Sequence, residues 1–287
     1  MAREPITGII PFTYFRGNNK PVGSTVLRVD ALTNGNPDFE KWQHAKKYDQ
    51  LIFQKAYWIE MMEIFEGPMI LDLCDPDWIK NGLDIVKIGN LVHAITCSSE
   101  ALCVLLRSYF PKKMVICVPD RLDLNFYPKP KRTHTDDARI LVWFGFIHNA
   151  YETLAKFAPF IKANDLKLKI ISNLPYTKED DILELNPEFF LFHHSSAYEH
   201  IKTGDIVLNP KSEKSFFKYK SNNKSIISWK LGVPVAENIT ELEQLINADQ
   251  RNKQIEKMKS IVEKDYDINL SAQQYRSIFK QVRENYF

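Results

Sequence analysis

The 287-residue sequence lacks any strong excess of charge, with 38 lysines and arginines against 36 aspartates and glutamates and a formal net charge of +2. So mild a balance does not by itself indicate a nucleic-acid or anionic-membrane partner. Long apolar runs are also missing: none approaches the ~20 residues that cross a bilayer. The first residues lack the apolar centre of a signal peptide. We therefore expect a cytoplasmic protein that is soluble or at most peripheral.

Cysteine is scarce and is not spaced for metal binding. Cys74, Cys97, Cys103 and Cys117 stand in apolar surroundings, and none belongs to a Cys-x-x-Cys pair or a zinc spacing. The sequence therefore predicts buried free thiols and no metal site. A Gly-x-Gly-x-x-Gly turn after the first predicted strand is absent as well, which argues against a dinucleotide-dependent oxidoreductase.

What the sequence does contain is a regular alternation of short apolar segments with helical patterns. This alternation is typical of parallel sheets with helices on both faces. Strands are predicted at residues 6–12, 49–54, 69–73, 94–97 and 114–118, and again at 139–144, 167–171, 189–192, 205–208 and 233–236. Helices are predicted at 24–32, 57–65, 85–91, 99–109, 151–164, 197–202, 224–231, 240–246, 250–264 and 271–285.

The two series of strands are separated by a polar segment. Residues 121–137 carry two prolines and show no periodicity, which favours an interdomain linker. The sequence thus predicts one Rossmann-like domain over residues 1–120 and a second over 138–270, followed by a terminal helix over 271–287. Ligands of open α/β sheets bind at the carboxyl ends of the strands, so residues that follow strands are the site candidates.

A polar cluster, Ser221-Asn222-Asn223-Lys224, stands directly before an apolar-periodic run that ends at Gly232. Asn or Ser is a good first cap of a helix, and Gly is a good stop. Lys224 and the backbone N–H groups of the first turn would then concentrate positive charge at one helix N-terminus. Such a point suits a diphosphate, although an ordinary capped surface helix has the same local pattern.

Residues 218–236 resemble the donor-binding region of GT-B glycosyltransferases related to family 4. Members often read Asn/Pro-x-Lys, a helix, then Ala-x-Gly-x-Pro-Val, with the Lys eight residues before the Gly, as Lys224 precedes Gly232. Residues 203–210 look like the family's strand that ends in Pro, and 140–145 resemble the first strand and glycine turn of its second domain. The similarity of pattern spans roughly residues 6–285.

This resemblance implies two Rossmann-like α/β domains that face each other across a cleft. Residues 1–120 would bind the acceptor and 138–270 the nucleotide sugar, and the helix over 271–287 would pack back on the first domain. It also implies a glycosyltransferase, hexosyl- or pentosyl-, that moves a sugar from a nucleotide-sugar donor to an acceptor hydroxyl with no bound metal or other cofactor.

The resemblance assigns donor binding to residues that follow strands of the second domain. His148 and Asn149 stand where many relatives place an Arg and a Lys, and Lys224 would stabilise the leaving diphosphate as a catalytic residue. The donor-binding candidates are Gly145, His148, Asn149, Ser172, Asn173, Lys218, Lys220, Ser221, Asn222, Asn223 and Lys224.

In the first domain, Asp75, Asp77 and Trp78 follow the third predicted strand. A carboxylate there can act as general base on an acceptor hydroxyl or orient a sugar, and the Trp can stack on a sugar or base. The alternative is that these aspartates only cap a turn. The loop after the first strand supplies further candidates for the acceptor or cleft loop, namely Arg16, Gly17, Gly23 and Ser24.

The sequence departs from the family at one point. Retaining family-4 enzymes usually carry two glutamates separated by seven residues, and Tyr219 and Ile227 occupy those positions here. The stereochemistry therefore stays open, and a non-catalytic protein that binds a nucleotide or nucleotide sugar is the alternative. The acceptor also stays open between a glycan, a small metabolite and a hydroxylated base in phage-type DNA.

Overall fold

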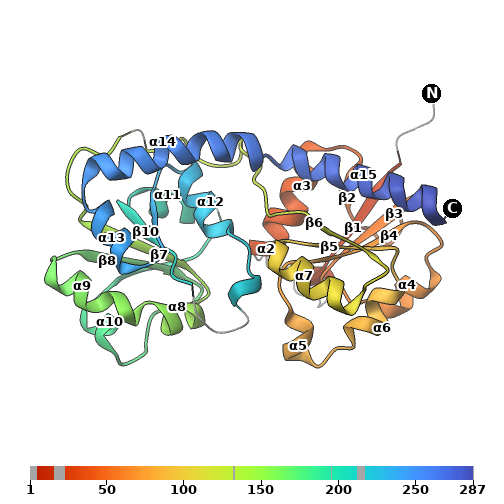
Figure 1. The fold of residues 1–287 in the computed structure, drawn as a ribbon, viewed down its shortest axis with the longest axis horizontal. Coiled ribbons are helices and arrows are strands. Elements are labelled where there is room, and N and C mark those ends of the chain that lie inside the picture. The colour runs from red at the N-terminus through yellow and green to blue at the C-terminus, as the bar shows by residue number, and fades with distance from the viewer. Residues whose placement is uncertain (1–4, 16–22, 132, 195, 212–216, 287) are drawn as a thin grey trace. The chain divides into compact units, whose positions relative to one another are not determined.

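The computed structural model describes residues 5–15, 23–131, 133–194, 196–211 and 217–286 (Figure 1). The chain forms two compact units. Unit 1 comprises Met1–Asp123, Ser215–Ser221 and Tyr266–Phe287, and unit 2 comprises Leu124–Lys214 and Asn222–Asp265. Each unit is an α/β domain built on its own parallel sheet.

The described part of unit 1 contains a six-stranded parallel sheet in the order β2-β1-β3-β4-β5-β6. Its strands are β1 (Thr7–Pro11), β2 (Phe39–Lys41), β3 (Gln50–Gln54), β4 (Met69–Leu73), β5 (Ala94–Cys97) and β6 (Met114–Cys117). All residues of β1, β3, β4 and β5 are buried, as expected for strands covered on both faces. The five predicted strands are confirmed. Strand β2 was not predicted, because only one of its three residues is buried.

Helices cover both faces of this sheet. Leu51 and Phe53 of β3 pack in one core with α4 (Ile59–Ile64), α5 (Asp77–Asn81), α6 (Ile85–Asn90) and α7 (Glu100–Tyr109). Ile52, between them, packs in the other core with the π-helix η1 (Val26–Asp30), α3 (Ala31–Gly35) and α15 (Ile268–Tyr286). The short helices α1 (Phe12–Phe15) and α2 (Gly23–Thr25) follow β1, and η3 (Phe217–Tyr219) also belongs to unit 1.

The described part of unit 2 contains a five-stranded parallel sheet in the order β11-β10-β7-β8-β9. Its strands are β7 (Ile140–Gly145), β8 (Lys167–Ser172), β9 (Glu188–Leu191), β10 (Ile206–Leu208) and β11 (Val235–Ala236). Its helices are α8 (Ile147–Thr153), η2 (Ala155–Phe157), α9 (Ala158–Ala163), α10 (Asp181–Glu184), α11 (Ala197–Lys202), α12 (Asn223–Lys230), α13 (Ile239–Leu245) and α14 (Ala248–Asp265). The predicted strands are confirmed apart from their ends.

One helix of unit 2 differs from the sequence prediction. A single helix was predicted over residues 151–164, whereas the chain forms α8, the 3₁₀ turn η2 and α9. Pro159 lies in the first turn of α9, where its missing N–H and fixed φ start a new helix rather than continue an old one. Helix α8 begins earlier than predicted, and the Asn173 side chain accepts a hydrogen bond from the Ile147 N–H at its start.

The strand orders mark where ligands can bind. In unit 2 the chain runs from β7 outward through β8 and β9, then returns to the other side of β7 with β10 and β11. In unit 1 the order reverses between β1 and β3. Connections leave in opposite directions at such switch points, which opens a crevice at the carboxyl ends of the two strands.

The domain boundaries need correction. Residues 215–221 and 266–270 were predicted in the second domain, yet both belong to unit 1. The Ser99 hydroxyl donates to the Tyr219 carbonyl, and Leu122 exchanges backbone hydrogen bonds with Tyr266 and Ile268. Much of the predicted linker 121–137 is integral to unit 2, where the Lys131 N–H donates to the Leu231 carbonyl.

Two cysteines also differ from the prediction. A disulfide joins Cys97, the last residue of β5, to Cys103 on the first turns of α7. Their Cα atoms lie 6.0 Å apart, within the usual range for such a bridge. Cys74 is a buried thiol, as predicted, whereas Cys117 is a thiol that is only half-buried. Among the described helices, none is both long and apolar enough to span a membrane.

His134 makes the stability of unit 2 depend on pH. Its buried ring donates from Nε2 to the Gly232 carbonyl at 3.1 Å, and its Nδ1 has no hydrogen-bond partner among the described residues. Burial, together with the nearby positive Lys131, lowers the pKa of His134 from 6.5 to about 4. The folded protein therefore keeps this ring neutral over a pH range in which the His134 ring of the unfolded chain binds a proton.

We expect unit 2 to lose stability as the pH falls from 6.5 to about 4, because only the unfolded state takes up a proton there. The pKa change corresponds to at most about 3 kcal/mol of unfolding free energy, and the loss levels off below the lower value. Urea unfolding across this range measures it. His134→Gln should flatten the curve by that amount, whereas His193→Gln, at an exposed position, should not. If the unfolding free energies of the wild type and His134→Gln change in parallel with pH, the lowered pKa of His134 would be contradicted.

Candidate functional site

The switch point of unit 2 brings Gly145 and Lys224 together. Gly145 ends β7 with a φ of 142°, a region that favours glycine. A Cβ atom on Gly145 would lie 2.8 Å from the Lys224 Nζ. That Nζ also lies 4.3 Å from the centre of the Trp143 ring. The ammonium group thus occupies space left by the glycine at the carboxyl end of β7.

The start of α12 adds further positive character to this point. Lys224 is in the first turn of α12, and among the described residues the Asn222 side chain makes no capping hydrogen bond. The sequence predicted such a cap, so this detail is corrected: Asn222 flanks the helix with its side chain exposed. The Asn209 amide, just after β10, donates to the buried Ser225 hydroxyl at 2.9 Å. Residues at the carboxyl ends of β7 and β10 therefore both contact the N-terminal turn of α12.

The other donor-binding candidates of unit 2 lie on neighbouring loops. Ser172 is buried at the end of β8, and its hydroxyl lies 3.3 Å from the Asn173 side-chain oxygen. The same oxygen accepts from the Ile147 N–H at 3.0 Å, so Asn173 holds the turn that follows Gly145. His148 is exposed on the first turn of α8, followed by Asn149. Asn173 is thus tied to the Gly145 turn by a side-chain hydrogen bond.

Three candidates from the basic loop belong to unit 1 instead. The Lys218 Nζ lies 4.9 Å from the centre of the Tyr219 ring, and the Lys220 Nζ lies 4.3 Å from that of Phe217. The Ser221 hydroxyl donates to the Asp120 carboxylate. The expectation that these side chains sit in the second domain is therefore wrong, because this segment packs on the first core.

In unit 1, Asp75 and Asp77 gather around a lysine that the sequence reading missed. The Lys55 Nζ lies 3.0 Å from Asp75 and 3.1 Å from Asp77, and the Tyr57 hydroxyl donates to Asp77. Burial alone would lower the pKa of Lys55, but the charges of Asp75 and Asp77 raise it well above its usual value. Lys55 therefore stays charged. Its position directly after β3 is the signal that could have identified it, by the rule that selected Asp75.

The remaining candidates for acceptor binding in unit 1 differ in how far they are exposed. Trp78 is buried in the first core, so its predicted stacking on a sugar is corrected to a packing role. Gly23 is exposed, and a Cβ there would meet no described atom within 4 Å. Ser24 is half-buried. Arg16 and Gly17 lie outside the described residues.

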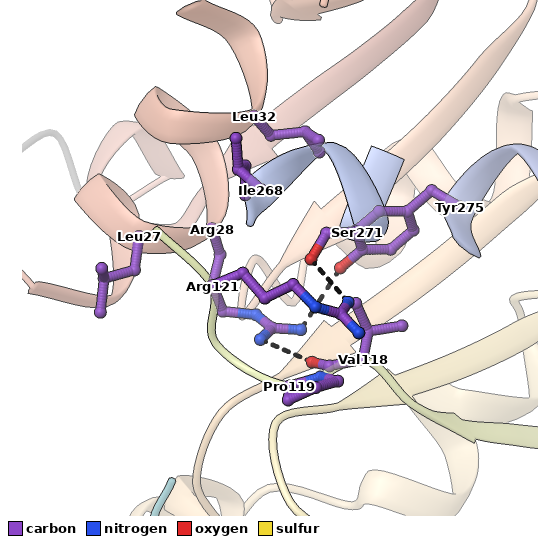
Figure 2. Close-up of a pocket in the computed structure, with 9 residues that line it drawn as sticks. All are labelled: Leu27, Arg28, Leu32, Val118, Pro119, Arg121, Ile268, Ser271 and Tyr275. Atoms are coloured by element: carbon purple, nitrogen blue, oxygen red, sulfur yellow. Dashed lines mark hydrogen bonds between the residues drawn. The ribbon is translucent and has the colours of Figure 1, made fainter. Parts of the chain in front are cut away.

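Unit 1 also contains a small cavity beside the buried guanidinium of Arg28 (Figure 2). Its volume of about 10 Å³ holds roughly one water molecule and no sugar. Figure 2 shows the Arg28 and Arg121 side chains side by side, with Arg121 donating to the Ser271 hydroxyl at 3.1 Å. Within the described residues, no group of three His, Cys, Asp or Glu side chains is arranged to hold a metal ion.

No protein-family model matches the sequence, and no curated protein matches it. Several solved structures, however, match the fold of this chain. Alr3699/HepE from Anabaena, in complex with UDP-glucose, matches 97% of this chain and 100% of its own with a TM-score of 0.70 at 13% identity. A glycosyltransferase from Rickettsia africae ESF-5 matches 99% and 100% with a TM-score of 0.62 at 9% identity. AviGT4, a glycosyltransferase involved in avilamycin A biosynthesis, matches 97% and 98% with a TM-score of 0.56 at 10% identity.

At these identities the likeness shows the fold and no more. The predicted fold class of two Rossmann-like α/β domains, as in GT-B glycosyltransferases, is confirmed by the two parallel sheets and these matches.

We expect Gly145→Ala to disturb the ammonium at the end of β7. An alanine strains the backbone at this φ by about 1–3 kcal/mol, and its Cβ displaces the Lys224 Nζ. The affinity for inorganic pyrophosphate, measured by calorimetry, should fall along with the free energy of unfolding. Gly82→Ala is the matched control, since Gly82 also has a positive φ but open space around it. Unchanged pyrophosphate affinity in Gly145→Ala would contradict the site.

Proposed function

We propose that this protein is a glycosyltransferase that moves a sugar from a nucleotide-sugar donor to an acceptor hydroxyl. The observation that carries the proposal is the Lys224 ammonium, held at the Gly145 turn and at the first turn of α12. Both lie at the switch point of unit 2, where open α/β sheets bind ligands. HepE, which has the same fold, was solved with UDP-glucose, and this supports a nucleotide sugar as the donor.

The diphosphate of the donor is the group that this arrangement suits. It carries negative charge, and the first turn of α12 offers backbone N–H groups together with the positive end of the helix dipole. The Trp143 ring lies against one side of the ammonium, where its face attracts the cation and limits access of water. The proposal therefore assigns the donor to unit 2, with the diphosphate between Lys224 and the Gly145 turn.

The same groups explain how the reaction would be accelerated. When the bond between the sugar carbon and the diphosphate oxygen breaks, the electron pair stays on the diphosphate, and its negative charge grows. Lys224 and the helix N-terminus are already oriented toward that charge, so they stabilise the transition state more than the bound donor. This mechanism requires no bound cation or further cofactor.

We assign the acceptor to unit 1 and its deprotonation to Asp75. The Asp75 side chain is 25% exposed and that of Asp77 is 18% exposed, and Asp77 also accepts the Tyr57 hydrogen bond. Asp75 also accepts hydrogen bonds from Lys55 and Cys74, so its greater exposure is the reason that we assign it the proton of an acceptor hydroxyl as that oxygen attacks the sugar. Lys55 holds both carboxylates in place.

Binding without transfer is the second candidate function. The positions of the paired glutamates of family 4 are taken by Tyr219, which packs against the first core, and by the buried Ile227. Neither position offers a carboxylate to the sugar. We nevertheless keep the relation to family 4 in the proposal because of the spacing of Lys224 and Gly232. The cytoplasmic location expected from the sequence suits the thiols of Cys74 and Cys117, whereas the Cys97–Cys103 disulfide is typical of an oxidising compartment.

We expect Lys224→Met to lower the turnover number for UDP-glucose hydrolysis, followed as UDP release, by a factor on the order of 100 or more. The charge that stabilises the leaving group would be gone while the apolar stem remains. Lys230→Met is the matched control, since Lys230 ends the same helix. Unchanged turnover in a well-folded Lys224→Met variant would refute the role of Lys224. UDP binding without any release from UDP-glucose would favour the binding protein.

Asp75→Asn keeps the shape of the side chain and removes its basicity. We expect it to reduce the turnover number about 10²–10⁴-fold without changing the KM for UDP-glucose, as the loss of a general base does. Asp77→Asn is the comparison, and its effect should be smaller. Initial rates over a range of UDP-glucose concentrations measure both variants. Equal losses in the two variants would show that the pair only orders the loop.

A further inference from the structure

The start of α12 has no side-chain cap of its own. Among the described residues, the Asn222 side chain accepts no hydrogen bond from the first turn of this helix. The start of α13 shows the usual arrangement, because the Asn238 side chain accepts from the Glu241 N–H at 2.9 Å. A first turn without such a cap frays more readily, so the beginning of α12 depends on how the chain just before it is held.

The segment before α12, Phe217–Ser221, is fastened to unit 1 at two points. The Ser99 hydroxyl donates to the Tyr219 carbonyl at 2.8 Å, and the Tyr219 side chain packs against the first core. The Ser221 hydroxyl donates to the carboxylate of Asp120, a residue that is only 3% exposed. One residue separates Ser221 from the first residue of α12. The second fastening therefore lies directly at the entry to the helix.

Asp120 is a firm point of attachment. One of its carboxylate oxygens accepts from Ser221, and the other accepts from the Arg28 guanidinium at 2.7 Å. Arg28 in turn donates to both oxygens of the buried Asp72 carboxylate. Turning the Asp120 carboxylate would break a buried ion pair, which is costly because a buried charge would lose its partner. Ser221 is thus tied to a polar network that resists movement.

This contact occupies the hydroxyl proton of Ser221. A serine hydroxyl has one proton to donate, and here it goes to Asp120. An ionised phosphate oxygen only accepts hydrogen bonds, so it would need a donor that Ser221 has already used. The sequence suggested Ser221 as a residue that contacts the donor. The structure instead favours a role in which Ser221 holds the chain in place.

We propose that Ser221 is a positioning residue of the donor site, and this inference rests on the proposed function. Its hydrogen bond to Asp120 fixes the chain at the entry to α12, and with it the first turn that carries Lys224. Ser99 supports the same segment through the Tyr219 carbonyl. When the Ser221 hydroxyl is lost, the first turn frays, and its N–H groups and the ammonium spend less time in the orientation that binds a diphosphate.

Calorimetric titration of the full chain with inorganic pyrophosphate tests this role. We expect Ser221→Ala to weaken pyrophosphate binding about three- to tenfold, which is the effect of losing one hydrogen bond. Ser221→Thr keeps the hydroxyl and should bind with nearly the wild-type affinity. The proposal is overturned if Ser221→Ala binds as tightly as the wild type, or if Ser221→Thr binds no better than Ser221→Ala.

The Ser99 fastening provides an independent test, because Ser99 is not a candidate for contact with the donor. Ser99→Ala also removes the cap of α7, where the hydroxyl accepts from the Leu102 N–H. Asp84→Ala is the matched control, since Asp84 caps α6 in the same unit through the Lys87 N–H. Both variants should lower Tm, whereas only Ser99→Ala should weaken pyrophosphate binding. Equal affinities in the two variants would overturn the proposal.

UDP release from UDP-glucose, measured on the same samples, reports on the proposed function separately. If Ser221→Ala weakens pyrophosphate binding but the wild type releases no UDP, the transferase fails and the positioning role stands. If the wild type releases UDP and Ser221→Ala binds pyrophosphate normally, the positioning role alone fails. A wild type that binds no pyrophosphate overturns the positioning role whatever the UDP release.

Discussion

Unit 1 depends on the ion pairs and hydrogen bonds of the Arg28 guanidinium group. It is buried, and it donates to both oxygens of Asp72, to Asp120 and to the Val118 carbonyl at 2.6 to 2.9 Å. Tyr275 of α15 donates to the same Asp72 carboxylate, and Asp120 also accepts from Ser221. A buried ion pair with one partner removed is strongly destabilising, about 3–5 kcal/mol. One cation therefore joins three stretches of the chain that are far apart in the sequence.

This arrangement leaves the two units with different chemistry at their carboxyl edges. In unit 1 the cations Arg28 and Lys55 each pair with two aspartates, so carboxylates are in excess there and neither cation is left to attract an anion. In unit 2 the Lys224 ammonium lies against an aromatic ring and a glycine at a helix N-terminus. The proposed diphosphate site is therefore at the edge of unit 2, where a cation stands at a helix N-terminus.

Sequence patterns predicted most of the fold, because a buried parallel strand is a short apolar run whatever its partners are. Elements with weak local signals were missed or misread. Strand β2 has one buried residue, and the turn between α8 and α9 depends on Pro159 within an otherwise helical pattern. In the candidate site, the spacing of Lys224 and Gly232 and the position of Asp75 after a strand selected residues that lie at a helix N-terminus and directly after β4. Lys55 was overlooked because a single Lys is not a motif, although its position directly after β3 meets the rule that selected Asp75.

The sequence by itself determined the α/β class, the alternation of elements and the residues that end strands, since these follow from local periodicity and from the chemistry of each side chain. Tertiary structure alone decided which of those residues act together. The strand reversal at β7 placed Gly145 against Lys224. The segment ending at Ser221 went to unit 1 because Asp120 accepts its hydroxyl, a long-range contact that no local pattern encodes.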